Sequence, residues 1–365
     1  MDINDAWPSA LRLVWLTGGL VAVSEPQDRE VRIMTYVNGR TIAAFQLKTY
    51  GSLFGALRLL GFLIIGSTFV TDPEQTQGLR APEFRANGTG GWPVWNALQS
   101  WGQIASAAAR KDEMRLMDVA SRIATGLEYS EMRLYDLAMS YSAQLHSHLK
   151  SDEPKPYQAF KDTMSPSVYK DIHALFWEMA VLRDAIAEFI AVFGLKRDDA
   201  TTLSGVLRSL KRVSSADGLA IEILTICDGE DPSGWLGRFG AYRDCFTHSA
   251  PLEQVRGTAF AVQDLLILKD GALVPQIYFP LPKNPAALMR DRARGTLFKT
   301  LKEMAHARAG QHDRSQEPDA LEYLHRCLCQ LTELSLRLVA RSPIAPQPIV
   351  ITRADIIGQV KITGR

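Results

Sequence analysis

The sequence predicts a mainly α-helical protein, in which a helical bundle carries an inserted β-hairpin and follows a small N-terminal domain that contains β-strands. Three observations support this class. Apolar residues recur at the three- and four-residue spacing of amphipathic helices through much of residues 93–345. Residues 30–47 alternate loosely between apolar and polar side chains around the pair Asn38-Gly39, which is typical of tight hairpin turns. A second hairpin is expected near residues 259–282, where an Asp-Gly pair separates two apolar runs.

Composition narrows the class of protein. The chain has 365 residues, 46% of them hydrophobic, which is enough for one large domain or two ordinary ones. Its net charge is only +1, so no protein-wide positive field is present, and any RNA contact must come from a local patch. The 4 cysteines are too few for a disulfide framework, and the first residues lack the basic region of a secretory signal. We therefore expect a cytoplasmic protein.

We place a domain boundary in residues 71–92, which are rich in proline, glycine and polar side chains. This division gives an α+β domain at residues 1–92, a helical domain at residues 93–345 and a C-terminal tail at residues 346–365. One strand is expected in the tail, at residues 348–352. Trp92, Trp95 and Trp101 form an aromatic cluster at the boundary, and we expect them to pack the two domains together, with a partner-docking patch as the alternative.

An apolar run at residues 53–70 is about long enough for a short membrane span. It contains Arg58, and an arginine in a lipid-facing helix costs at least about 2.5 kcal/mol. We therefore expect a buried core segment and no membrane association. Periodicity does not decide whether residues 59–70 form a strand or the end of a helix.

In the helical domain at residues 93–345, we predict breaks in the helical pattern near Gly126, at residues 151–156 and at residues 194–199. Similar eight-residue stretches at 113–120 and 131–138 indicate two helical stretches with the same amphipathic pattern. The remaining helices are expected at residues 167–193, 200–213, 219–226, 234–249, 286–309 and 321–341. The longest of these has a broad apolar face that suits a bundle.

Only one stretch of the sequence indicates chemistry, and it closes the predicted helix at residues 234–249. There Arg243 precedes His248 by five positions. Arginine is a permanent cation that binds phosphate through two N–H groups, and histidine changes charge near neutral pH. Together they can act on a phosphodiester without a metal ion. The spacing alone is weak, because about one or two arginines five to seven residues before a histidine are expected by chance in this composition.

The segment Arg243-Asp244-Cys245-Phe246-Thr247-His248, followed by Ser249-Ala250-Pro251, resembles the motif of the HEPN superfamily (higher eukaryotes and prokaryotes nucleotide-binding), and the chain is similar to its uncharacterised bacterial members over residues 129–340. The resemblance implies a helical bundle that binds RNA or acts as a metal-independent endoribonuclease, in a prokaryotic toxin or defence system. It also implies a homodimer, because catalytic members join two motifs into one site. Asp244 departs from the asparagine that is common at this position, and its carboxylate can pair with a cation or repel a phosphate.

In this interpretation His248 is the general acid or base and Arg243 stabilises the charge on the phosphate. Thr247, Ser249 and Asp244 complete the candidate substrate-binding set. Five residues rotate side chains by about 140° on an ideal helix, so Arg243 and His248 converge only at a distorted helix end or between two copies.

The competing interpretation is structural. Arg243 would make a buried ion pair with Glu178 or Asp184, and His248 would cap the last carbonyls of its helix. The protein would then be a non-catalytic helical scaffold that dimerises or docks a partner, with the N-terminal domain as the specific element. We predict no cofactor and no metal ion, because nucleotide and zinc motifs are absent from the sequence and His146 and His148 are expected on the solvated surface.

Overall fold

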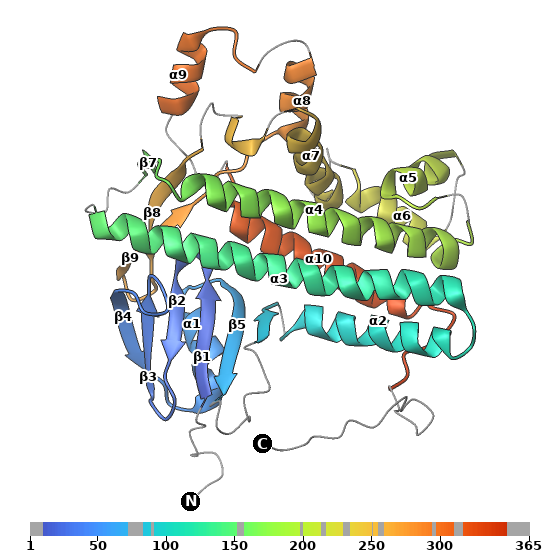
Figure 1. Ribbon diagram of the computed structural model, residues 1–365, viewed down its shortest axis with the longest axis horizontal. Helices are drawn as coiled ribbons and strands as arrows, with labels where there is room; N and C mark the ends of the chain where they lie inside the picture. Colours follow the sequence, from blue (N-terminus) through green and yellow to red (C-terminus); the bar gives the residue numbers. More distant parts are fainter. Residues whose placement is uncertain are drawn as a thin grey trace, which may run out of the picture.

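The computed structural model describes residues 10–71, 83–88, 91–151, 157–197, 200–212, 217–228, 234–249, 251–254, 259–293, 297–309 and 317–348. The fold is mainly helical. A β-sheet formed by the N-terminal strands lies beneath a layer of long helices, as Figure 1 shows.

The sheet has six antiparallel strands in the order β4-β3-β2-β1-β5-β6. Its strands are β1 (Ala10–Leu16), β2 (Val21–Ser24), β3 (Glu30–Met34), β4 (Thr41–Gln46), β5 (Ile64–Thr71) and β6 (Glu83–Ala86). The first strand lies in the interior of the sheet, where Arg12 pairs with Ser24 on one side and with Phe69 on the other. The predicted hairpin at residues 30–47 is confirmed as β3 and β4. Its loop is longer than a two-residue turn, since the Thr35 amide donates to the Arg40 carbonyl at 3.2 Å.

The apolar run at residues 53–70 forms a helix followed by a strand, the two structures between which its periodicity did not decide. Helix α1 (Leu53–Leu60) ends at Gly61, whose φ of 103° closes the helix in the left-handed region that favours glycine. Strand β5 follows and crosses the sheet next to β1. In the described part of the chain, no helix has the length and apolar character needed to cross a membrane.

Long helices form the bundle: α2 (Pro93–Ala109), α3 (Met114–Ser151), α4 (Ser165–Phe189), α7 (Trp235–His248) and α10 (Ala320–Val339). Helix α3 runs without interruption through Gly126, so the predicted break there is wrong. A Cβ on residue 126 would lie 3.1 Å from the Cβ of Leu182, which shows that glycine allows α3 and α4 to approach closely. The two similar stretches at 113–120 and 131–138 both lie along this helix, except for Glu113, which precedes its first residue.

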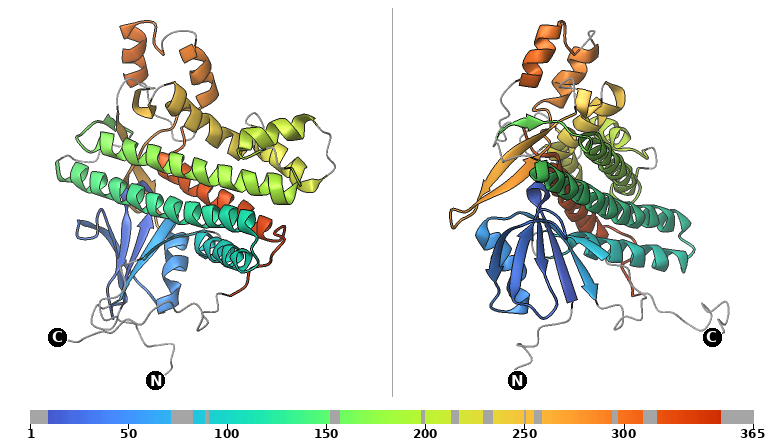
Figure 2. Two further views of the ribbon diagram at one scale, coloured as in Figure 1. Left: turned by 45° about the vertical axis from the view of Figure 1, so that its right-hand side comes forward. Right: turned by 60° about the vertical axis from the view of Figure 1, so that its left-hand side comes forward.

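Shorter elements complete the helical region: α5 (Leu203–Arg212), α6 (Gly218–Ile226), α8 (Pro285–Ala293) and α9 (Leu301–Ala309), with a π-turn at Ile190–Gly194 and 3-10 turns at Thr17–Gly19, Tyr50–Ser52 and Leu252–Gln254. The single helix predicted at residues 286–309 is therefore two, and Figure 2 shows both on the far side of α4 from the sheet. The second predicted hairpin is confirmed as β8 (Ala261–Ile267) and β9 (Leu273–Tyr278), and β7 (Ala159–Phe160) pairs with β8. The strand predicted at residues 348–352 falls outside the described residues, except for Pro348.

One continuous cluster of buried apolar side chains extends from Leu13 in β1 to Ile344 after α10. The sheet and the bundle therefore share a core. Trp92 contacts Phe69 of β5 with ring centroids 5.9 Å apart.

The other two tryptophans make separate contacts. The Arg85 guanidinium lies 3.9 Å from the centre of the Trp95 ring, which is a cation–π contact between β6 and α2. Trp101 is fully buried against Phe189 of α4. Trp92 and Trp95 thus pack the sheet against the bundle, and Trp101 packs two helices together.

Candidate nucleic-acid site at the end of α7

Helix α7 carries the predicted motif and is fixed by its apolar face. The buried residues of this face recur at three-residue spacing: Leu236, Phe239, Tyr242 and Cys245. The Phe239 and Phe176 rings stack 5.5 Å apart, which joins α7 to α4. The Tyr242 hydroxyl donates a 2.6 Å hydrogen bond to the Pro282 carbonyl, just before α8. Burial raises the pKa of Tyr242 and keeps this donor protonated.

Arg243 pairs with its neighbour in the sequence. Its guanidinium Nη1 lies 2.9 Å from Asp244 Oδ1, and the two side chains are 20% and 40% exposed. The alternative partner Asp184 instead binds Arg183 at 3.0 Å, and no ion pair joins Arg243 to Glu178 within the described part of the chain. The buried ion pair that the structural interpretation required is therefore absent from these residues. The Nε atom of Arg243 is buried without a hydrogen-bond partner.

His248 lies in the last turn of α7 and is exposed to solvent. Thr247 is partly buried, and its hydroxyl oxygen has no hydrogen-bond partner. The Ser249 amide donates to the Cys245 carbonyl at 2.9 Å, which continues the helical pattern past His248. The helix end is therefore regular in its hydrogen bonding.

Residues four apart lie on one side of a helix, so Arg243 and Thr247 share one side of α7 and Asp244 and His248 share the next. No hydrogen bond or ion pair links Arg243 to His248 among the described residues. The structure thus places all five candidate residues at the end of one helix and leaves Arg243 and His248 on neighbouring sides.

A second imidazole, that of His173 on α4, lies against the motif. Its ring stacks on Phe246 with centroids 4.6 Å apart and planes at 12°. Its Nε2 accepts a hydrogen bond from the Leu252 amide at 3.3 Å, and Glu253 Oε2 is 3.8 Å away. Burial lowers the pKa of His173, which favours the neutral ring that this acceptor role requires. The sequence does not reveal these contacts of His173, because its partners are more than 70 residues away along the chain.

The histidines expected on solvated surface are engaged in packing. His146 Nδ1 lies 3.0 Å from the Thr35 hydroxyl, and His148 stacks on Phe160 at 3.7 Å between ring centroids. That expectation is therefore wrong for both residues. Across the described ranges, no group of three or more His, Cys, Asp and Glu side chains has the geometry of a metal site.

The motif itself offers the Arg243 guanidinium, the exposed imidazole of His248 and the Asp244 carboxylate. Asp244 neutralises Arg243 in this arrangement, so a phosphate must displace Asp244 before Arg243 can bind it. The chain matches no protein-family model, no curated protein and no solved structure. The resemblance to the HEPN superfamily accordingly rests on the motif residues and stays a prediction.

Proposed function

We propose that this protein binds RNA at the C-terminal end of α7 and cleaves it without a metal ion, as a homodimer in which two motifs form one site. A prokaryotic toxin or defence system is the setting that the resemblance implies. The observation that carries the proposal is an exposed His248 beside two buried polar atoms without partners, Arg243 Nε and Thr247 Oγ1. Such atoms are rare in folded proteins and cost about 1–3 kcal/mol each. A bound phosphate or a second copy of the chain would give them partners once the side chains that cover these two atoms shift.

Cleavage of RNA in this way needs a base for the 2′-hydroxyl, an acid for the leaving oxygen and a cation at the phosphate. One His248 can serve as the acid and the His248 of a second copy as the base. Arg243 supplies the cation once it releases Asp244. A dimer also removes the geometric difficulty within one helix, since the two residues that act together come from different copies.

The test uses the purified full-length protein, total RNA and EDTA. We expect wild-type protein to cleave RNA and leave 2′,3′-cyclic phosphate ends, and we expect His248→Ala and Arg243→Ala to lower the rate about 100-fold or more. His306→Ala is the matched control, because His306 is an exposed histidine on α9. Thermal unfolding verifies that each variant is folded. Failure of wild-type protein to bind or cleave any RNA would refute the proposal, as would full activity in His248→Ala.

Asp244→Asn tests the role of the ion pair. Because the amide cannot neutralise Arg243, we expect this variant to bind RNA more tightly than wild-type protein at equal ionic strength. Equal affinity would show that Asp244 does not limit access of phosphate to Arg243.

A second candidate function is a non-catalytic scaffold that dimerises through α3 and α4. One observation favours it: Val181 of α4 is 61% exposed, and Tyr129 of α3, 50% exposed, lines the same groove. Trp177, one turn before Val181, is 48% exposed. Sedimentation of wild-type protein and Val181→Glu distinguishes the two candidates. A dimer that Val181→Glu dissociates, together with wild-type protein that neither binds nor cleaves RNA, would establish the scaffold.

A further inference from the structure

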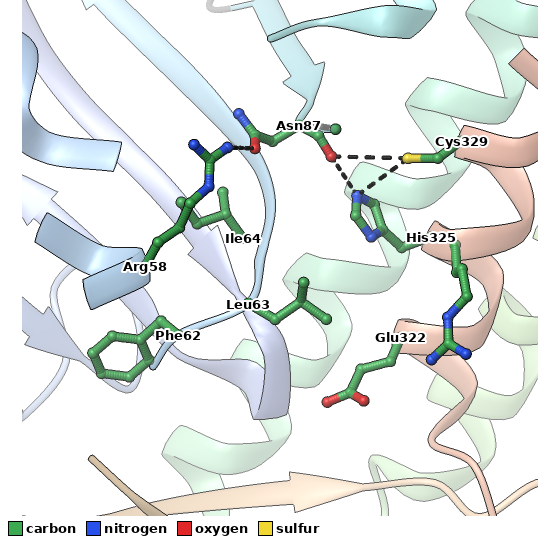
Figure 3. Close-up of a pocket in the computed structure, with 10 residues that line it drawn as sticks. Arg58, Phe62, Leu63, Ile64, Asn87, Glu322, His325 and Cys329 are labelled. Carbon is green, nitrogen blue, oxygen red and sulfur yellow. Dashed lines mark hydrogen bonds between the residues drawn. The ribbon is translucent and has the colours of Figure 1, made fainter. Parts of the chain in front are cut away.

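A pocket of about 460 Å³ lies where the sheet region meets α10, away from the end of α7. Its walls come from the end of α1 and the start of β5, from Asn87 and Gly88 after β6, and from α10 (Figure 3). The volume falls within the range of about 300–1,000 Å³ that is typical of small-molecule sites. The proposed RNA chemistry does not use this pocket.

His325 forms the polar floor of the pocket. The residue is only 6% exposed, and its Nε2 lies 2.6 Å from the Asn87 carbonyl oxygen. Since a carbonyl only accepts, Nε2 carries the proton and donates it. Burial lowers the pKa of His325, so the ring is neutral and Nδ1 presents a lone pair.

Nδ1 of His325 has no partner among the described residues, and Figure 3 shows it directed away from Asn87. The site therefore offers an acceptor that fits an N–H group of a ligand.

Cys329 lies beside His325, with Sγ 3.9 Å from the same Asn87 oxygen. Burial raises the pKa of Cys329 to about 12, so this sulfur is a thiol and not a nucleophilic thiolate at neutral pH. The pocket is accordingly better suited to binding than to covalent chemistry.

The rim of the pocket is charged. Arg58 and Arg326 are both exposed, and Arg58 Nη2 donates a 2.8 Å hydrogen bond to Asn87 Oδ1. Glu322 is the one carboxylate in the lining. Among the described residues of the lining, two guanidinium groups and one carboxylate sum to a single positive charge with His325 neutral, which matches a monoanion such as a carboxylate better than a dianionic phosphate.

The third side of the pocket is apolar. Phe62 and Ile64 are each 3% exposed and form a rigid wall, whereas Leu63 between them is 44% exposed and lines the opening. Its exposed surface can contact an aliphatic side chain of a ligand.

We propose that this pocket binds an N-acylated apolar amino acid, either as a free small molecule or as the C-terminal residue of a peptide. The ligand carboxylate contacts Arg326 and Arg58, its amide N–H donates to His325 Nδ1, and its aliphatic side chain packs on Leu63. Each part of the ligand thus contacts one feature of the pocket.

Calorimetric titration of the full-length protein with N-acetyl-leucine tests this proposal. We expect saturable binding, which Arg326→Gln weakens about tenfold, because a charge-assisted hydrogen bond is lost. Arg337→Gln is the matched control, since Arg337 is an exposed arginine of α10 that pairs with Glu222 outside the pocket. No binding by wild-type protein, or equal binding by Arg326→Gln, would overturn the proposal.

Two ligand analogues test the contacts without altering the fold. The amide of N-acetyl-leucine lacks the carboxylate, and N-acetyl-N-methyl-leucine lacks the N–H that His325 would accept. We expect each to bind about tenfold more weakly or worse. Undiminished binding of the N-methyl analogue would contradict the role of His325.

A longer peptide that ends in leucine distinguishes the two sources of the ligand. Binding of this peptide, tighter than that of N-acetyl-leucine, identifies a peptide C-terminus. Binding of N-acetyl-leucine alone identifies a free small molecule, and binding of neither refutes the proposal.

Discussion

The Tyr141 hydroxyl of α3 donates a 2.8 Å hydrogen bond to the carboxylate of Asp319, the residue that caps the N-terminus of α10. The same carboxylate accepts from the Phe279 amide at 2.9 Å and from the Glu322 amide at 3.1 Å. Tyr141 is fully buried, and burial raises its pKa well above the ordinary value, so it remains a donor. One carboxylate therefore joins α3, the end of β9 and the start of α10.

Removing this carboxylate should destabilise the protein. We expect Asp319→Ala to lower the free energy of unfolding by about 2–4 kcal/mol, because a helix cap is lost and two buried donors lose their acceptor. Asp319→Asn, whose amide oxygen still accepts, should cost less. Urea unfolding followed by circular dichroism measures both. A loss below about 1 kcal/mol for Asp319→Ala would contradict the role assigned to this contact.

Glycine at position 126 should be needed for the packing of α3 on α4. A larger side chain there meets Leu182, so we expect Gly126→Val to lower the free energy of unfolding by about 1–3 kcal/mol. Gly102 in α2 is the control, because nothing lies within 4 Å of a Cβ at that position. Gly102→Ala should stabilise the protein by about 0.5–1 kcal/mol through helix propensity. Thermal or urea unfolding of both variants decides the point, and equal effects would contradict close packing at Gly126.

Glu131 should make the protein less stable as the pH rises from mildly acidic values to neutral. Desolvation raises the pKa of this carboxyl from 4.5 to about 6, although Arg85 at 3.2 Å and the Ala86 amide at 2.7 Å act in the opposite direction. The folded protein thus binds more protons than the unfolded chain between these values. Stability from this group is present below about pH 4.5 and lost through about pH 6, a change of about 2 kcal/mol.

The measurement for Glu131 is the difference in the free energy of unfolding between wild-type protein and Glu131→Gln, taken across this pH range. Glutamine keeps an oxygen that can accept from Ala86 and does not titrate. A difference that stays constant with pH would show that Glu131 ionises normally.

His173 should make the protein less stable as the pH falls, which is opposite to the effect of Glu131. Its pKa in the folded protein is lowered by burial below the ordinary 6.5, so the unfolded chain binds the proton first as the pH falls. Stability from the neutral ring is present above that value and is lost as the pH falls through the folded pKa. Unfolding of wild-type protein and His173→Gln from about pH 7.5 to about pH 5 measures this contribution. The prediction would be contradicted if the free energy of unfolding fell more on acidification in His173→Gln than in wild-type protein.

Local patterns predicted local structure well in this chain. The apolar spacing of residues 167–193 and 321–341 identified α4 and α10, and Asp-Gly and Asn-Gly pairs identified both hairpins. The helix break predicted at Gly126 was wrong. Glycine stands there because Leu182 of another helix packs closely against it, and the sequence does not show that contact. Strand β1 carried no clear alternation, since most of its residues are buried, so periodicity could not distinguish it from a helix.

In the candidate site, too, the sequence predicted the local features and missed the contacts between distant segments. Sequence spacing located Arg243 and His248 and placed them correctly at the end of a helix. It could not reveal the stacking of His173 on Phe246 or the contact of His325 with Asn87, because both arise from packing between distant segments. Such contacts become visible only when the fold brings those segments together.

The interior position of β1 has a consequence for how the chain folds. Its two neighbours are β2, which follows directly, and β5, which begins about 50 residues later at Ile64. As the polypeptide is synthesised, one edge of β1 stays unpaired until β5 emerges, and a buried apolar strand with an open edge is prone to pair with other chains. The interval between the synthesis of β1 and that of β5 is therefore a period in which a nascent chain of this protein is exposed to aggregation.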